Sequence, residues 1–250
     1  MNASHSTWWR IAAGVVAAAL ACFGSTGRAE ELQLKWVTSW TAPMQAALVA
    51  PAYDLQPGLL FALPNATARN QTFRMIVKPD LWGQLLRVRL SNAFGTQPVT
   101  FSAVSIALQK HDANIVPGSS QTVTFGGSKQ VVVRPGDSVF SDPISLKPAA
   151  PVSSLFGLRK SSGKAVRNLA VSFAVSGSSD SLSFHRDAAA TSYISPPNSG
   201  DATVVEDDKG FPFSTTSSFF LSELDVAAAA ETVVVEGFGS TPSPTALSAR

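Results

Sequence analysis

Ser138, His185 and Asp187 are the residues of this chain that could supply a nucleophile, a base and an orienting acid. A serine hydroxyl attacks an ester carbonyl when a nearby histidine takes its proton and a carboxylate holds that histidine in place. His185 directly precedes Arg186 and Asp187 and is the best candidate base. The pattern nevertheless favours an ordinary histidine at the end of a strand with a charged neighbour. His111 lies in a polar Lys-His-Asp segment and is a weaker candidate.

The sequence around Ser138 predicts a turn rather than a nucleophile. A catalytic serine of the hydrolase type stands at a tight bend between a strand and a helix, close to backbone N–H donors. Here Ser138 is followed by Val-Phe-Ser-Asp-Pro, which is typical of a strand that ends at a proline. Pro135 and Gly136 suit the central positions of a type II turn, because proline fixes φ and glycine accepts a positive φ. We therefore predict a hairpin tip at Pro135-Gly136 and no catalytic role for Ser138.

The residue types of a metal or cofactor site are sparse in this chain. It contains 3 histidines and 1 cysteine, and the cysteine lies in the N-terminal segment, so a zinc cluster is not expected. Glu206, Asp207 and Asp208 form an acidic run, but the regular spacing of a calcium-binding loop is missing. We interpret this run as a solvated surface segment and expect neither a metal nor a cofactor.

The composition indicates a β fold for the elements that would carry these residues. Charged residues make up 14% of the chain, while Ser, Thr, Gly, Pro, Val and Phe are plentiful, which favours many short strands joined by turns. The net charge is +2 and no Lys/Arg cluster has interleaved aromatics, so nucleic acid is not an expected partner. We predict a mainly β protein, an antiparallel β-sandwich or jelly-roll-like domain.

Apolar patterns define the expected strands. Between residues 86 and 92 apolar side chains alternate with Arg87 and Arg89, which predicts a half-buried antiparallel strand with both arginines outward. Trp36 and Trp40 are expected on one face of the first strand, in the core rather than on a sugar-stacking platform. The expected strands are residues 34–40, 72–78, 86–92, 99–109, 122–125, 130–134, 138–140, 144–146, 169–175, 182–185 and 219–226, with a long connection over 42–69.

The first 29 residues are typical of an export signal. Arg10 supplies a positive charge, residues 11–23 form an apolar core, and Gly27-Arg28-Ala29 is a small-x-small cleavage site. The apolar core is shorter than the roughly 20 residues that a membrane span needs. We therefore predict a secreted or periplasmic protein without a stable membrane span. Cys22 is an alternative site of lipid attachment, although the large aliphatic residue usual three positions earlier is absent.

Residues 232–239, Thr-Val-Val-Val-Glu-Gly-Phe-Gly, are predicted to form a buried strand that runs into a glycine-bracketed turn. This stretch resembles the first block of the SGNH/GDSL hydrolases, in which an apolar strand leads to Phe/Leu-Gly-Asp-Ser-Ile-Thr-Asp-Gly. Further segments resemble, in order and spacing, the N-terminal β domain of secreted bacterial members of this family. These segments are Trp36–Trp40, Arg87–Gly95, Thr124–Gly127, Ser141–Pro143, Thr191–Tyr193 and Phe219–Leu221.

The resemblance implies hydrolysis of acyl or acetyl esters by a Ser-His-Asp mechanism, yet this chain departs from the family block at the catalytic position. Ser240 stands where the family has aspartate and Thr241 where it has the nucleophilic serine, so neither inherits a role. The family's downstream Asn and Asp-x-x-His blocks are also absent. One choice of codons for residues 240–246 reads Asp-Ser-Ile-Thr-Asp-Gly in a shifted frame, so we expect a frameshift after Gly239.

Three parts are therefore expected: a signal peptide in residues 1–29, a β-sandwich accessory domain in residues 30–230, and a remnant in residues 231–250. The remnant would be only the first strand of an α/β/α SGNH hydrolase domain. The chain would then be a truncated extracytoplasmic ester hydrolase, inactive as printed, whose intact family acts on lipids or acetylated carbohydrates. The alternative is a stand-alone secreted β-sandwich module for carbohydrate binding or adhesion, with Trp82 or Tyr193 as stacking groups.

Overall fold

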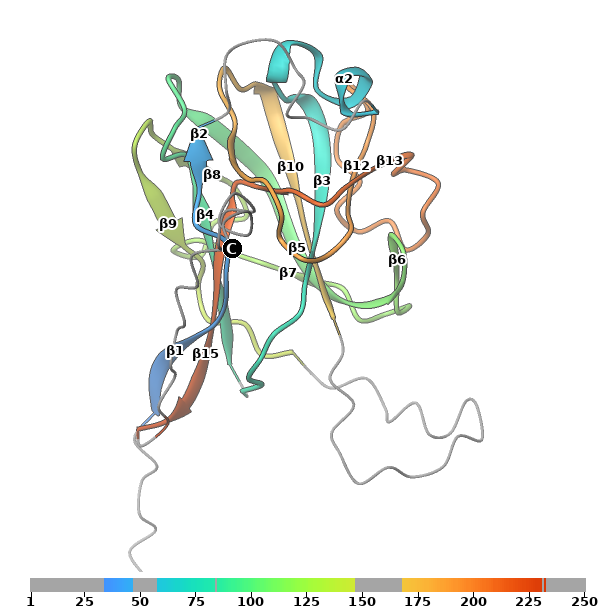
Figure 1. Ribbon diagram of the computed structural model, residues 1–250. Coiled ribbons are helices and arrows are strands. Elements are labelled where there is room, and N and C mark those ends of the chain that lie inside the picture. Colours follow the sequence, from blue (N-terminus) through green and yellow to red (C-terminus); the bar gives the residue numbers. More distant parts are fainter. Residues whose placement is uncertain (1–33, 47–57, 84, 147–167, 231, 233–250) are drawn as a thin grey trace, which may run out of the picture. The chain divides into compact units, whose positions relative to one another are not determined.

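The computed structural model describes residues 34–46, 58–83, 85–146, 168–230 and 232 of the chain. The expected export signal and the expected turn and tail after residue 232 lie outside these described residues. Strands dominate the described part, with α2 (Leu59–Ala62) and η1 (Pro64–Ala66) as short helical turns (Figure 1). The strands are β1 (Leu34–Thr41), β2 (Gln45–Ala46), β3 (Arg69–Val77), β4 (Leu86–Ser91), β5 (Val99–His111), β6 (Asn114–Ile115), β7 (Gln121–Thr122), β8 (Val131–Val133), β9 (Ser138–Phe140), β10 (Leu169–Ser178), β11 (Ser183–His185), β12 (Ser192–Ile194), β13 (Phe213–Thr215), β14 (Ser218–Phe219) and β15 (Leu221–Ala229).

Antiparallel pairing joins the strands of the described residues into three sheets. The small sheet has the order β1-β15-β4-β9, and the large sheet has the order β13-β12-β3-β10-β5-β6, with β7 and β8 also paired to β5. A third sheet consists of β14-β11-β2. The prediction of a mainly β, antiparallel fold is confirmed.

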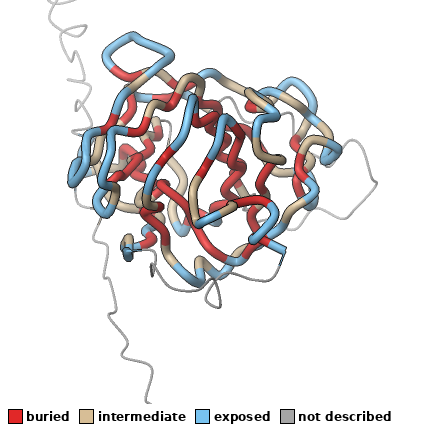
Figure 2. The backbone as a smooth tube through the Cα atoms, turned by 90° about the horizontal axis from the view of Figure 1, so that it is seen from above, coloured by how far each residue is buried: buried red, intermediate tan, exposed pale blue. Residues whose placement is uncertain are grey.

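The inner faces of the small and large sheets share one hydrophobic core. Val88 and Leu224 of the small sheet belong to the same buried cluster as Phe73, Val104 and Val171 of the large sheet. Figure 2 shows the buried residues concentrated along the strands and the exposed ones in the connecting loops. Two sheets that bury their facing side chains against each other form a β-sandwich, so each strand has an inner and an outer face.

Strand β4 has the alternation expected from the sequence. Leu86, Val88 and Leu90 are fully buried, while Arg87 and Arg89 lie on the outer face of the small sheet. Because side chains alternate along a strand, the apolar positions face the core and the arginines are left at the surface. The predicted orientation of both arginines is confirmed.

The prediction that Trp36 and Trp40 share a face is wrong. The register of β1 against β15 shifts between Thr38 and Trp40, which is the mark of a β-bulge at Ser39. One extra residue reverses the side-chain alternation beyond it. Trp36 therefore lies on the outer face, over the guanidinium of Arg87, while Trp40 packs against the core.

The expected last strand, residues 219–226, is in fact two strands with a corner between them. Phe219 ends β14 in the third sheet, and Leu221 begins β15 in the small sheet. Phe220 joins them with a φ of 56°, a left-handed conformation that aromatic residues rarely adopt. Its ring packs edge-on against Phe73 and Phe101, so the corner is buried in the centre of the sandwich.

Several short elements were not expected from the sequence. The stretch expected as a connection, residues 42–69, contains β2, α2 and η1, and strands β6, β12 and β13 also had no signal. Residues 144–146 were expected as a strand but contribute only an isolated bridge between Ile144 and Leu86. No helix among the described residues is long and apolar enough to cross a membrane.

Candidate functional site

The described residues do not bring Ser138, His185 and Asp187 together. His185 Nδ1 lies 2.8 Å from the carbonyl oxygen of Pro43, so this nitrogen carries the proton and donates it. Asp187 Oδ1 accepts a hydrogen bond of 3.1 Å from the backbone N–H of Ala189. The candidate base and the candidate acid therefore each bond to the backbone rather than to one another.

Ser138 bonds to an arginine rather than to a base. Its hydroxyl oxygen accepts a hydrogen bond of 2.8 Å from Nε of Arg89 on the neighbouring strand β4. Arginine stays protonated in proteins and cannot take a proton from a serine. Ser138 thus has the environment of a residue that holds a surface side chain in place.

The turn before Ser138 is partly as predicted. Gly136 has a φ of 81°, and the N–H of Asp137 donates to the carbonyl of Arg134 at 3.1 Å, as a type II turn requires. The expected hairpin is wrong, because β8 pairs with β5 in the large sheet while β9 pairs with β4 in the small sheet. The turn therefore carries the chain from one sheet to the other.

Asn92 fastens this crossover to the end of β4. Its backbone N–H donates to the carbonyl of Asp137 at 2.9 Å, and its carbonyl accepts from the N–H of Gly136 at 3.0 Å. Its buried side-chain amide donates to the carbonyl of Val133 at 3.1 Å. A β-carbon on Gly95 would lie 1.8 Å from Oδ1 of Asn92, so only glycine fits there. The end of the segment 87–95 therefore holds the crossover turn in place through Asn92 and Gly95.

Asp142 connects the segments Thr124–Gly127 and Ser141–Pro143. Its carboxylate accepts the hydroxyl of Thr124 at 2.6 Å and the backbone N–H groups of Gly126 and Gly127, each at 2.8 Å. These three bonds, above all that from Thr124, hold the pKa of Asp142 below its ordinary value. Both glycines have positive φ, 58° and 80°, which other residues adopt only with strain. The carboxylate thus fixes a glycine turn and is not free for chemistry.

The outer face of the small sheet carries a cluster of arginines, aromatics and acids. Arg87 donates from Nε to Oδ2 of Asp225 at 2.9 Å, and its Nη2 lies 2.8 Å from the same oxygen. The Arg87 guanidinium lies 4.6 Å from the ring centre of Trp36 and 4.0 Å from that of Phe140. A flat cationic group that lies over an aromatic ring gains from stacking and from the negative charge of the π face. The sequence did not single out Asp225 as a partner of Arg87.

Glu223 completes this cluster beside Arg89. Oε2 of Glu223 accepts from Nη1 of Arg89 at 3.1 Å, and Oε1 accepts the hydroxyl of Thr38 at 3.0 Å. The signal that could have found the cluster is the alternation of acids on β15 directly opposite the alternating arginines on β4.

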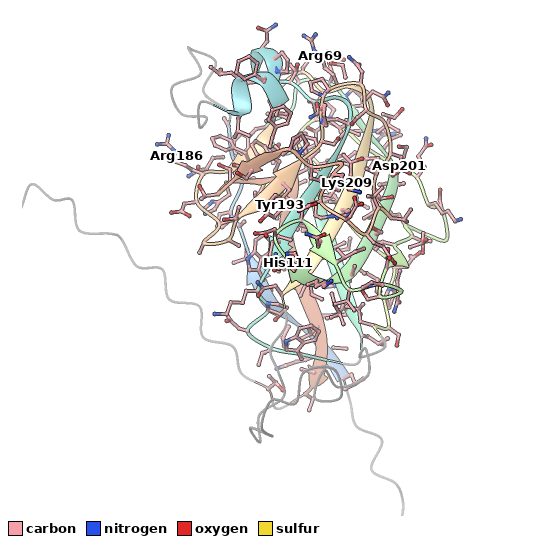
Figure 3. The ribbon with its side chains drawn as sticks, turned by 90° about the vertical axis from the view of Figure 1, so that its right-hand side faces the viewer. Arg69, His111, Arg186, Tyr193, Asp201 and Lys209 are labelled. Carbon is pink, nitrogen blue, oxygen red and sulfur yellow. The ribbon has the colours of Figure 1, made fainter. Side chains whose placement is uncertain are left out.

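A polar region lies on the outer side of the large sheet, where Tyr193, His111 and Lys209 share one side of the molecule (Figure 3). The hydroxyl of Tyr193 donates to Oδ1 of Asp112 at 3.4 Å. Burial and then the charge of Asp112 raise the pKa of Tyr193. His111 Nδ1 lies 3.3 Å from Oδ2 of the same aspartate, so His111 remains a surface residue with an acidic neighbour.

An open pocket of about 370 Å³ lies on the same side of the large sheet. Its lining residues include Lys110, Asn114, Ile115, Val205, Glu206 and Asp207. Glu206 Oε1 accepts the backbone N–H of Gly118 at 2.8 Å, and Asp207 lies 3.7 Å from the ammonium of Lys209. No group of His, Cys, Asp or Glu within the described ranges has a metal-site arrangement.

Arg74 is a fully buried charge, which no pattern in the sequence predicted. It donates from Nε to the hydroxyl of Ser172 at 2.9 Å, and from its two terminal nitrogens to the carbonyls of Ala113 and Val205. Burial lowers its pKa to about 10, and the charge of Asp207 opposes that shift. Arg74 thereby ties the acidic segment after residue 200 to the outer face of the large sheet.

Trp82, one of the two predicted stacking groups, packs against the hydrophobic core. Its Nε1 is buried and has no hydrogen-bond partner in the described part of the chain. Tyr193, the other predicted stacking group, is partly buried and packs against a second, smaller apolar cluster. Neither a scan against protein-family models nor a search of curated proteins gives a match for this chain.

Proposed function

We propose that the described β-sandwich is the non-catalytic accessory domain of an SGNH/GDSL-type ester hydrolase. The observation that carries this proposal is that residues in the family-like segments hold turns of the domain in place by hydrogen bonds. Asp142 closes the glycine turn at Gly126-Gly127, and Asn92 anchors the sheet crossover at Gly136. Asp142 and Asn92 stabilise the fold of a supporting domain, and neither is available as a group for acyl transfer.

The candidate catalytic groups support the same reading. Ser138 Oγ accepts from Arg89, and His185 Nδ1 donates to a backbone carbonyl, so these two candidates are not paired as nucleophile and base among the described residues. The proposal therefore assigns ester hydrolysis to a hydrolase domain that residues 232–239 would begin, in the reading frame that restores Asp-Ser-Ile-Thr-Asp-Gly after Gly239.

Two measurements test the proposal. Sequencing the gene across codons 236–250 should yield the Asp-Ser-Ile-Thr-Asp-Gly peptide in a shifted frame, and its absence there would refute the frameshift. The purified 250-residue protein and its Ser138→Ala variant should both hydrolyse a small chromogenic ester no faster than the buffer alone. If the unchanged protein hydrolyses the ester and Ser138→Ala abolishes this activity, the sandwich itself is the enzyme.

The second candidate function is a carbohydrate-binding module, favoured by the partly buried Tyr193 beside a polar region. Its hydroxyl is fixed by Asp112, and Ile115 belongs both to the open pocket and to the apolar cluster on which Tyr193 packs. An apolar platform with fixed polar groups suits sugar rings. Binding to a glycan array should then be lost in Tyr193→Ala and kept in Phe61→Ala, an exposed aromatic elsewhere. Absence of glycan binding in the unchanged chain would remove this candidate.

A further inference from the structure

Two carboxyl side chains lie next to each other on the outer face of β15. Glu223 and Asp225 are two residues apart on the strand, so both point away from the core on which Leu224 packs. The side chain of Asp225 is only 3% exposed and that of Glu223 is 18% exposed. Two neighbouring carboxylates with so little solvent repel each other strongly when both are ionised.

The bonding of Asp225 is incomplete. Oδ2 receives both contacts from Arg87, whereas Oδ1 is buried and has no hydrogen-bond donor among the described residues. A buried acceptor without a partner is costly, and such groups in folded proteins call for an explanation. A protonated carboxyl group on Glu223 would supply that donor, because its side chain lies within hydrogen-bonding reach of Asp225. With the proton on Oε1, Oε2 would still accept from Arg89, and Oε1 could still accept from Thr38 while it donates to Oδ1 of Asp225.

We propose that Glu223 holds a proton in the folded domain and donates it to Oδ1 of Asp225, which makes the small sheet an acid-stabilised lock. In this state Arg87 and Asp225 form the ion pair, and Glu223 contributes a neutral hydrogen bond. As the pH rises, Glu223 loses the proton, Oδ1 of Asp225 loses its donor, and two buried negative charges face each other. The sheet then loosens at the strand that leads out of the described domain. This inference is independent of the proposed function.

The surroundings of Glu223 act in both directions. Burial raises the pKa of Glu223, and so do a hydrogen bond to Asp225 and its negative charge; the hydrogen bonds from Arg89 and Thr38 lower it. The charged groups on this face are Arg87 and Arg89 from β4 and Asp225 from β15. The flanking strands add neutral side chains to the described face: Trp36, Thr38, Ser138 and Phe140.

The direction of the pH effect follows from the raised pKa. The folded state binds this proton more tightly than the unfolded chain, in which Glu223 has its ordinary pKa of 4.5. The stabilisation is therefore fully present below that value and is lost as the pH rises through the higher pKa of the folded state. Each tenfold tighter binding of the proton in the folded state than in the unfolded state raises the Tm at low pH, relative to high pH, by about 3–5 °C for a domain of this size.

The test compares the full chain with Glu223→Gln, whose side-chain amide imitates the protonated acid at every pH. Carboxyl ¹³C NMR of the unchanged protein should give a pKa for Glu223 clearly above 4.5. The Tm of the unchanged protein should fall between pH 5 and pH 8 relative to that of Glu223→Gln. Asp207→Asn, a surface acid in an ion pair with Lys209, serves as the control and should leave the pH profile unchanged.

A second variant keeps the inference falsifiable. Asp225→Asn removes the charged neighbour, so the pKa of Glu223 should return towards 4.5. If that variant does not fold, the NMR titration of the unchanged protein and the Glu223→Gln profile decide the matter. A Glu223 pKa at or below its ordinary value, or an equal Tm change in Glu223→Gln at both pH values, would overturn the proposal.

Discussion

The hydroxyl oxygen of Ser138 accepts a hydrogen bond of 2.8 Å from Nε of Arg89. This bond crosses from β9 to β4 on the outer face of the small sheet and fixes the arginine that also pairs with Glu223. The guanidinium has no lone pair with which to take the proton of the serine, so Arg89 cannot act as a base for Ser138. The Gly-Asp-Ser tripeptide at residues 136–138 is therefore a crossover turn followed by a structural serine.

Replacing Ser138 by alanine should lower the free energy of unfolding by about 1 kcal/mol. The bond has a charged donor but is only half-buried, which places its value near the middle of the range for hydrogen bonds in proteins. Urea unfolding of the variant measures the change. Ser138→Thr keeps the hydroxyl and should recover most of the loss; an equal loss in both variants would mean that the bond to Arg89 is not what matters.

Removing the buried guanidinium of Arg74 should cost about 3–4 kcal/mol. In Arg74→Met the methylene stem is largely kept, but the carbonyls of Ala113 and Val205 and the hydroxyl of Ser172 lose their donors. Guanidinium-chloride unfolding should show a lower midpoint. Arg69→Met is the matched control, because Arg69 lies exposed on the same strand and should change stability by less than about 0.5 kcal/mol. Equal stability of Arg74→Met and the unchanged protein would contradict this account.

Asp142 should stabilise the domain at neutral pH and lose this contribution at low pH. Its pKa is below the ordinary value in the folded state, so its contribution is present above that ordinary value of 3.8 and is lost as the pH falls through the lowered value. Asp142→Asn should therefore be less stable than the unchanged protein at pH 7, and the difference should shrink towards pH 2. Thermal unfolding across this range measures it. Asp137→Asn, an exposed acid in the neighbouring turn, should show no such convergence.

The sequence predicted the parts of the fold that depend on local pattern. The alternation in residues 86–91 defined β4, and the Pro135-Gly136 pair defined a turn with positive φ at the glycine. It did not predict the bulge at Ser39, because one extra residue in a strand leaves no trace in the apolar pattern of a seven-residue stretch. Strands β12 and β13 have three residues each, too few to show a period, and the sequence predicted no strand there.

The candidate clusters depend on residues that are far apart in the chain. Arg74 and Arg87 look alike in the sequence, since each lies among apolar residues within a strand. Arg74 is fully buried because the segment around Val205 covers the outer face of the large sheet, while Arg87 is held at the surface by Asp225. Nothing near either arginine encodes these partners, which are 131 and 138 residues away.

At Phe220 the loss of the ring and the positive φ should have separate effects on stability. Its ring lies 5.7 Å from that of Phe73 and 5.5 Å from that of Phe101, both nearly perpendicular, so Phe220→Ala should open a cavity and cost about 3–5 kcal/mol. Its φ of 56° should make glycine the better small residue there.

Phe220→Gly should accordingly be more stable than Phe220→Ala, by about 1 kcal/mol, because alanine strains in the left-handed region and glycine does not. The neighbouring Phe219 gives the matched pair, since it is equally buried but lies in β14 without a positive φ. There the order should reverse, with glycine less stable than alanine by about 0.5–1 kcal/mol. Urea midpoints of the four variants measure both differences. If glycine and alanine rank in the same order at both positions, the backbone at Phe220 relaxes once the ring is removed. The packing of the ring, and not the connection between β14 and β15, would then be the cause of the positive φ.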